Sequence, residues 1–381
     1  MSLLSIGMSG LNAAQGSLSV LSNNIANVNT PGYSRQQTTQ NANANNPYGG
    51  VFIGSGTTLA DVRRVYNEFL DQAYQNSTSL NNDAKAYSSQ ASAIDKTLSD
   101  KTTGMSSVLS AFFAAVQTSS ANPSDVSARQ VLLTSAQTLS NRFNSISNQL
   151  NQQKESINGQ LSTMSDQVNQ LTASIASLNK QITQVQGSSN SAPANLLDAR
   201  NEAVRSLNEL VGVTASEKNG VFSVSTGTGQ SLVLGDQSNT ISAVPSASDP
   251  SQYTIQLNAG GGTAIDLGNV LSGGSIGGLL RYRSDALMPA INDLGRIAIA
   301  TADTVNSQLG QGLDLNGDFG TSLFKDINSA AAIAQRSQGA AGNSVGSGNL
   351  NVSIKDSSKL STYDYKVTFT SGSNYTVMRS D

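Results

Sequence analysis

The sequence predicts an α+β protein of several domains, in which long helices are accompanied by antiparallel β regions. Three observations lead to this fold class. The N-terminus is an uncharged amphipathic stretch, the middle of the chain carries a heptad pattern over about fifty residues, and short alternating runs follow residue 212. With 381 residues, the chain is long enough for two or three domains.

The composition excludes several classes of function. Only 12% of the residues are charged and the net charge is −3, so there is no electrostatic basis for binding nucleic acid or an anionic membrane. Cysteine and histidine are absent, which excludes disulfides, thiol nucleophiles and histidine acid–base chemistry. The same absences remove zinc sites, and no cofactor is expected. No stretch reaches the roughly 18 apolar residues of a membrane span, and no cleavable signal peptide is recognisable.

Residues 1–35 are predicted to form a terminal assembly helix and the turn that ends it. Steps of three, four and seven place the large apolar side chains on one face, while Ser, Asn, Gln, Ala and Gly occupy the opposite face. No charged residue precedes Arg35. A narrow apolar face on a neutral helix favours packing against another helix in an assembly. The predicted assembly interface consists of Leu4, Met8, Leu11, Leu18, Leu21, Ile25 and Val28.

The helix is followed by Thr30-Pro31-Gly32-Tyr33. The residue before a proline avoids the α region, so the helix is predicted to stop before Pro31. Pro31 and Gly32 suit the two central positions of a type II turn, where glycine supplies the positive φ. We expect Tyr33 and Arg35 to contact neighbours in an assembly rather than only to pack locally.

The end of this segment reads NNIANVNTPGYSR, residues 23–35. It resembles the N-terminal signature of the axial proteins of the bacterial flagellum, which comprise rod, hook and hook-associated proteins. Two later regions, 51–75 and 277–320, are similar to the hook-associated protein 1 (FlgK) family, the hook–filament junction proteins. The motif residues are Asn23, Asn24, Ile25, Ala26, Asn27, Thr30, Pro31, Gly32, Tyr33 and Arg35.

The resemblance implies a structural, non-enzymatic subunit that joins the flagellar hook to the filament by packing its terminal helices. The implied partners are the flagellar hook protein, the second hook–filament junction protein, copies of the chain itself in a helical ring and an export chaperone, but neither nucleic acid nor membrane. The implied location is extracellular, after export without a cleaved signal peptide, although the sequence alone suggests a cytosolic protein. The alternatives are another axial protein of hook or rod, and a secreted adhesin that binds through a β domain.

The resemblance also predicts a C-terminal helix that pairs with the N-terminal one. No such amphipathic segment is found near the end of these 381 residues. Either the chain is truncated at its C-terminus or it is a divergent member of the family. We favour truncation, with the chaperone site in the missing region.

Residues 36–61 are polar and rich in Asn and Gly, and they predict an extended linker. Residues 62–212 are predicted to form a helical bundle domain whose longest helix carries a heptad seam from Leu133 to Val185. Periodicity leaves two partners open for this seam, a second chain or other helices of the same chain, and we favour the intramolecular bundle. A further amphipathic helix at 194–211 is expected to expose Asp198, Arg200, Glu202 and Arg205.

The residue pattern changes from helical to alternating after this predicted helix. Residues 213–275 predict an antiparallel β domain, because short alternating runs are separated by Gly, Asn, Asp and Pro. Residues 276–312 predict a helix that Pro289 starts or kinks. Residues 313–381 are predicted to begin a further, incomplete β domain, with its first strands at 350–355 and 363–370.

Two short motifs approach catalytic or metal-binding patterns. Asp314-Leu315-Asn316-Gly317-Asp318 follows the start of a calcium loop, but Phe319 stands in place of the sixth-position glycine and Lys325 in place of the bidentate glutamate. A family turn is therefore favoured over a calcium site. Ser177 and Lys180 match a serine acyl-transfer motif, but its companion motifs are missing and the heptad helix contains both residues. We expect no metal site and no catalysis at these positions.

Overall fold

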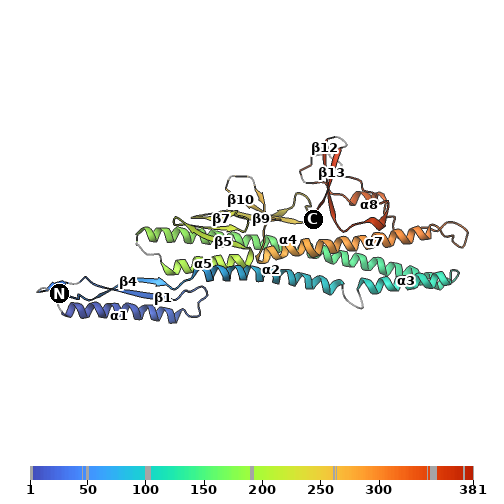
Figure 1. Cartoon of the computed structure of the whole chain (residues 1–381). Helices are drawn as coiled ribbons and strands as arrows, with labels where there is room; N and C mark the ends of the chain where they lie inside the picture. Colours follow the sequence, from blue (N-terminus) through green and yellow to red (C-terminus); the bar gives the residue numbers. More distant parts are fainter. Residues whose placement is uncertain are drawn as a thin grey trace.

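The molecule is elongated, with a small terminal unit at one end, long helices running along its length and strands on one side of them (Figure 1). The structure is a computed structural model. The structure describes residues 3–44, 46–48, 51–98, 104–188, 193–260, 262, 264–340, 342–343, 350–371 and 374–380.

The terminal unit, residues 3–64, contains α1 (Leu3–Ala26) and the antiparallel strands β1 (Gln36–Ala42) and β4 (Thr57–Arg64). Beyond these strands, β2 (Asn46–Tyr48) pairs with β3 (Val51–Ile53). The prediction of an extended linker over 36–61 is wrong, because β1 and β4 form a hairpin that packs along α1. The sequence QQTTQNA of β1 lacks alternating apolar residues, so its pattern gives no strand signal.

Four helices follow the terminal unit. They are α2 (Glu68–Leu98), α3 (Met105–Ala121), α4 (Val126–Ser188) and α5 (Ala194–Leu210). The predicted heptad helix is α4, whose 63 residues span about 95 Å at 1.5 Å per residue.

Two antiparallel sheets succeed α5, as predicted for 213–275. The first has the order β5 (Val213–Lys218), β6 (Val221–Thr226), β7 (Ser231–Leu234) and β8 (Gln237–Ser238). In the second, β10 (Tyr253–Asn258) lies between β9 (Thr240–Pro245) and β11 (Ile265–Asp266). Both sheets pack on α4.

The predicted helix at 276–312 is divided into three parts. α6 (Gly274–Tyr282) continues through one π-helical turn (Arg283–Leu287) into α7 (Met288–Leu309). Pro289 lies in the first turn of α7, directly after the π-helical turn, so its missing N–H falls where the regular helical hydrogen-bond pattern is already interrupted.

The described residues of the last region include a short helix and a hairpin. α8 (Ala330–Gln335) is followed by a 3₁₀ turn (Ser357–Lys359) and the antiparallel strands β12 (Asp364–Ser371) and β13 (Asn374–Ser380). The predicted strand at 350–355 is wrong, since these residues form no strand, whereas the one at 363–370 corresponds to β12.

The heptad seam of α4 is buried inside this chain. Ile157, Leu161, Val168 and Ile175 are fully buried and belong to one core with side chains of α5, both sheets and α6. Near the start of α4, a second buried cluster consists of Phe112, Ala136 and Leu139, and Val305 of α7 packs against it. The seam therefore has its partners within the chain, which are mainly α3, α5 and the strands, while α2 contacts α4 much less.

Candidate functional site

The predicted assembly face of α1 is exposed along its whole length. Leu4, Leu11, Leu18 and Ile25 are each more than 60% exposed, and Val28 just beyond the helix is 74% exposed. Met8 and Leu21 complete the face at about half exposure, and Leu3 extends it at the N-terminal end. Within the described residues, no other part of the chain covers these side chains. An uncharged apolar stripe of this length on a helix is unusual for a surface in water.

The opposite face of α1 carries the hairpin. Ala13 is buried there, and Gly16 allows Leu59 of β4 to approach so closely that an added Cβ would lie 3.1 Å from it. The Ser17 hydroxyl is within hydrogen-bond distance of the Thr38 hydroxyl on β1, at 3.1 Å. Because small and polar side chains hold the hairpin, the large apolar ones remain outside.

The motif asparagines tie the end of α1 to β1. The Asn24 side chain accepts a hydrogen bond from the Gln36 backbone N–H at 2.8 Å and donates one to the Gln36 carbonyl at 2.9 Å. The same Asn24 oxygen accepts the Tyr33 hydroxyl at 2.8 Å. Asn23 donates to that hydroxyl at 3.3 Å, and Asn27 donates to the Asn23 side chain at 2.9 Å. These motif residues therefore have a local role, which is to fold the chain back against the helix end.

The predicted type II turn is confirmed. The Tyr33 backbone N–H donates to the Thr30 carbonyl at 3.2 Å, and Gly32 has a φ of +77°. Pro31 and the side chain of Arg35 are exposed, while the Arg35 carbonyl accepts a hydrogen bond from Val65 at 2.8 Å. Ile25 and Ala26 are exposed on the helix, so they take no part in the local network.

The turn also contacts α5, far away in the sequence. The Asp198 carboxylate accepts a hydrogen bond from the Ser34 backbone N–H at 3.1 Å and forms an ion pair with Arg64 of β4 at 2.8 Å. Both side chains of this pair are largely buried, at 12% and 8% exposure. Gly32 lies against Glu202, and an added Cβ would be 2.8 Å from its carboxylate oxygen.

A second buried carboxylate lies beside this contact. Asp71 of α2 receives two hydrogen bonds from the Arg205 guanidinium, one from the Tyr66 hydroxyl at 3.0 Å and one from Gln75 at 2.8 Å. Burial, together with the charge of Asp71 and its hydrogen bond, raises the pKa of Tyr66 to about 12. Burial alone lowers the pKa of Arg205, but the hydrogen bonds and charges of Asp71 and Glu202 outweigh it, and its pKa lies above the ordinary value.

The expectation that α5 exposes its charges is wrong for most of them. Asp198 and Arg200 are buried, Arg205 is three-quarters buried, and only Glu202 is substantially exposed. The Arg200 guanidinium stacks over Phe222 at 3.7 Å, and burial lowers its pKa despite the nearby Glu217. Sequence reasoning named these residues but missed their burial and their contacts, although four charges within eight positions of a charge-poor chain were a usable signal.

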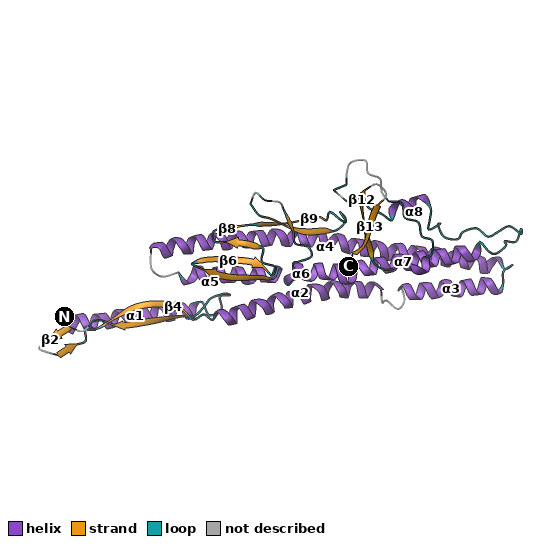
Figure 2. Ribbon diagram, turned by 45° about the horizontal axis from the view of Figure 1, so that its top comes forward, coloured by secondary structure: helices purple, strands orange, loops and turns teal. Residues whose placement is uncertain are grey.

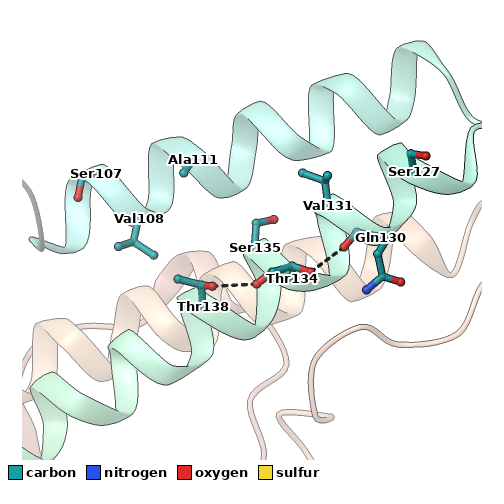
Figure 3. Close-up of a pocket in the computed structure, with 9 residues that line it drawn as sticks. All are labelled: Ser107, Val108, Ala111, Ser127, Gln130, Val131, Thr134, Ser135 and Thr138. Carbon is teal, nitrogen blue, oxygen red and sulfur yellow. Dashed lines mark hydrogen bonds between the residues drawn. The ribbon is translucent and has the colours of Figure 1, made fainter.

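The structure also contains a groove between α3 and α4, with a volume of about 690 Å³ (Figure 3). Its nine lining residues are Ser, Thr, Gln, Ala and Val, and none of them titrates near neutral pH. The Thr134 and Thr138 hydroxyls each donate to a backbone carbonyl one turn earlier, at 2.9 Å (Figure 3). The groove therefore offers no activated nucleophile and no acid–base pair.

The calcium-like loop forms a compact turn. The Asp314 carboxylate accepts hydrogen bonds from the backbone N–H groups of Asn316 at 2.7 Å and Asp318 at 3.0 Å. These backbone hydrogen bonds, led by that of Asp318, lower the pKa of Asp314. Among the residues that the structure describes, no group of three or more acidic side chains is placed to hold a metal ion. None of the described helices combines the length and apolar character needed to cross a bilayer.

Two family profiles match the chain. The helical domain of the flagellar hook-associated protein FlgK matches residues 91–324, which covers α3 to α7. The flagella basal body rod protein family matches residues 4–33, which covers the exposed face of α1 and the turn. The match to the rod family is thus confined to the terminal segment.

Individual proteins agree with the larger profile. Flagellar hook-associated protein 1 of Salmonella typhimurium is 35% identical over 384 residues, which span 100% of this chain and 68% of that protein. The Escherichia coli K12 protein of the same name is also 35% identical, over 97% of this chain and 66% of its own length.

One solved structure, the flagellar hook junction protein FlgK from Burkholderia pseudomallei, matches the fold with a TM-score of 0.71 at 34% identity. The match covers 81% of this chain and 54% of that one, so this chain spans about half of the solved relative. The profile, the relatives and the fold agree, and the chain therefore belongs to the FlgK family of flagellar hook-associated proteins.

Proposed function

We propose that this chain is a non-enzymatic structural subunit of the bacterial flagellum that joins hook to filament. The observation that carries the proposal is the uncovered apolar face of α1, on a helix whose other face is held by its own hairpin. Such a face is suited to pack against helices of neighbouring subunits. Family membership supplies the flagellar context.

The face is large enough to drive assembly. Burying a Leu, Ile or Met side chain contributes about 1.5–3 kcal/mol, so covering seven such positions supplies on the order of 10 kcal/mol before the entropic cost of association. The absence of charge on α1 matters equally, since no buried ion has to be compensated when the face is covered.

The proposed partners are the hook protein on one side, the second junction protein on the other and copies of this chain in a ring. An export chaperone is proposed as a further partner before assembly. The proposed location is the outside of the cell, reached without a cleaved signal peptide. The match to the rod family over residues 4–33 supports a terminal segment that axial proteins share, while the match over 91–324 favours the junction over the rod.

The test is binding to isolated hooks. A cysteine in place of the exposed Asp236 would carry a gold label, because the natural chain has no other thiol. Electron microscopy should find label at hook tips for the wild-type chain. Leu11→Asp and Ile25→Asp place a carboxylate in the apolar face and should lower tip labelling at least about tenfold, since burying an unpaired charge costs several kcal/mol.

The matched control is Asn12→Asp. Asn12 is exposed on α1 and lies about 100° around the helix from Leu11. The substitution Asn12→Asp therefore adds the same charge outside the apolar face. Its labelling should equal that of the wild type. Equal labelling of hook tips by Leu11→Asp and Asn12→Asp would contradict the assembly role of this face.

A further inference from the structure

The terminal unit is joined to the rest of the molecule through one short covalent connection. β4 ends at Arg64 and α2 begins at Glu68, so three residues, Val65 to Asn67, form the link. Figure 2 shows the terminal unit lying beyond the start of α2, at the end of the molecule. A single link of this kind allows one body to turn relative to the other unless further contacts oppose it.

One carboxylate supplies such a contact at two points of the terminal unit. Asp198 of α5 accepts the Ser34 N–H, from the turn after α1, and the Arg64 guanidinium, from the last residue of β4. These two positions lie at the same end of the terminal unit but on different segments of it. Because both attach to one buried side chain, the unit is held at two points and its rotation about the link is opposed.

Close packing reinforces this attachment. Gly32 leaves room for Glu202 one helical turn after Asp198, and the positive φ of Gly32 turns the chain so that Ser34 faces α5. Any side chain at position 32 would both strain the turn and displace Glu202.

The link itself is also held in place, through contacts of its residue Tyr66. The Tyr66 hydroxyl donates to Asp71, and the Arg64 guanidinium lies over the Tyr66 ring at 4.9 Å. Asp71 in turn binds Arg205 of α5. The link and the turn are thus both anchored to the same helix, α5, which follows them by more than 130 residues.

We propose that these contacts form a joint that sets the direction in which the terminal unit projects from the helical domain, with Asp198 as its central positioning residue. The joint orients the apolar face of α1 before any partner binds, which reduces the entropic cost of association. It is a property of the free chain, so its test is independent of the proposed function. The joint consists of Gly32, Ser34, Arg64, Tyr66, Asp71, Asp198, Glu202 and Arg205.

The test measures a distance across the joint. The chain contains no cysteine, so a pair of spin labels can be introduced at Asn12→Cys on α1 and Asn81→Cys on α2 without removing any native thiol. Both positions are exposed. Pulsed electron paramagnetic resonance should give one narrow distance distribution for the otherwise wild-type chain. Asp198→Asn removes the charge that holds Arg64 and should replace the narrow distribution by a broad one.

A second variant tests the joint without altering a buried charge. Gly32→Ala should also broaden the distribution, because its Cβ would collide with Glu202. Two controls match these changes. Asp236→Asn makes the same chemical change at an exposed turn, and Gly220→Ala imposes the same left-handed strain where no atom lies within 4 Å.

Both control variants should keep the narrow distribution. Circular dichroism and the unfolding midpoint of the helical domain should be unchanged by Gly32→Ala, which separates loss of orientation from loss of fold. The proposal is overturned if the wild-type distribution is already as broad as that of Asp198→Asn, or if both joint variants remain as narrow as their controls.

Discussion

In α4, apolar residues such as Ile157 and Ile175 are completely shielded by other elements of the chain. In α1, Leu11 and Ile25 repeat at comparable helical spacing but are 61% and 66% exposed. The hairpin of the terminal unit is close enough to cover them, yet it packs on the small and polar side of α1. Helical periodicity thus identifies the apolar face that packs against another element, but it does not tell whether that element belongs to the same chain.

The two helices also differ in charge. α4 carries exposed charged residues, among them Glu155, Asp166 and Lys180, and is suited to contact water there. α1 has no charged residue at all, so neither of its faces is specialised for water. This difference is consistent with a helix that is enclosed on several sides in its working state.

The strongest test of this comparison is to place the same charge in both faces. Ile157→Asp puts a carboxylate into a fully buried position and should lower the free energy of unfolding by about 4 kcal/mol or more. Leu11→Asp puts it into water and should change the free energy of unfolding by less than about 1 kcal/mol. Chemical denaturation followed by circular dichroism measures both.

A large destabilisation by Leu11→Asp in the dilute monomeric chain would show that the α1 face is already covered in solution. Asn12→Asp again serves as the control for added charge on α1. The free energy of unfolding of Asn12→Asp should differ from the wild-type value by no more than that of Leu11→Asp does.

A smaller effect is expected at the contact between α2 and α5, next to the terminal unit. Asp71→Asn removes the charge that pairs with Arg205, whose side chain is 24% exposed, and should lower the free energy of unfolding by about 2 kcal/mol. The matched control is Asp293→Asn, because its pair with Arg296 is exposed on both sides, and it should lose less than about 0.5 kcal/mol. If urea denaturation gives equal losses of unfolding free energy for both variants, the Asp71–Arg205 pair contributes no more than a surface ion pair.

The smallest effect concerns the titration of Tyr66. Its pKa is raised from 10.0 to about 12 by burial and by Asp71, so the folded state holds the phenolic proton more tightly than the unfolded state does. The resulting stabilisation is fully present below about pH 10 and is lost as the pH rises from there to about 12. Absorbance titration of the wild type minus Tyr66→Phe should show a transition near pH 12.

Asp71→Asn provides the comparison for this titration. Removing the neighbouring negative charge should shift the Tyr66 transition to lower pH. An identical transition in the wild type and in Asp71→Asn would mean that Asp71 does not act on Tyr66.

Several elements were predictable from local patterns. The heptad spacing of Ile157 to Val185 predicts a long helix, and α4 contains it in full. Pro31 and Gly32 predict the turn that is observed, because only a residue without a Cβ takes the required φ without strain. The runs after residue 212 predict antiparallel strands, and these strands form two sheets.

Other elements had no local signal. The strand β1 is polar on both faces, because it lies on Ser17 and other small residues of α1 rather than on an apolar core. The strand predicted at 350–355 is absent, since alternation there is not matched by a pairing partner. In the candidate site, the exposed face and the motif were predictable, whereas the burial of Asp198 and Arg205 was not.

The sequence by itself determined the positions of α1 and α4, the apolar face of each and the turn after α1, because these depend on contacts within a few residues. Only the tertiary structure decided which face is covered and which charges are buried. Asp198 meets Arg64 across 134 residues, and Asp71 meets Arg205 across the same separation. Local periodicity does not predict such pairs, because they arise from the way that distant segments pack together.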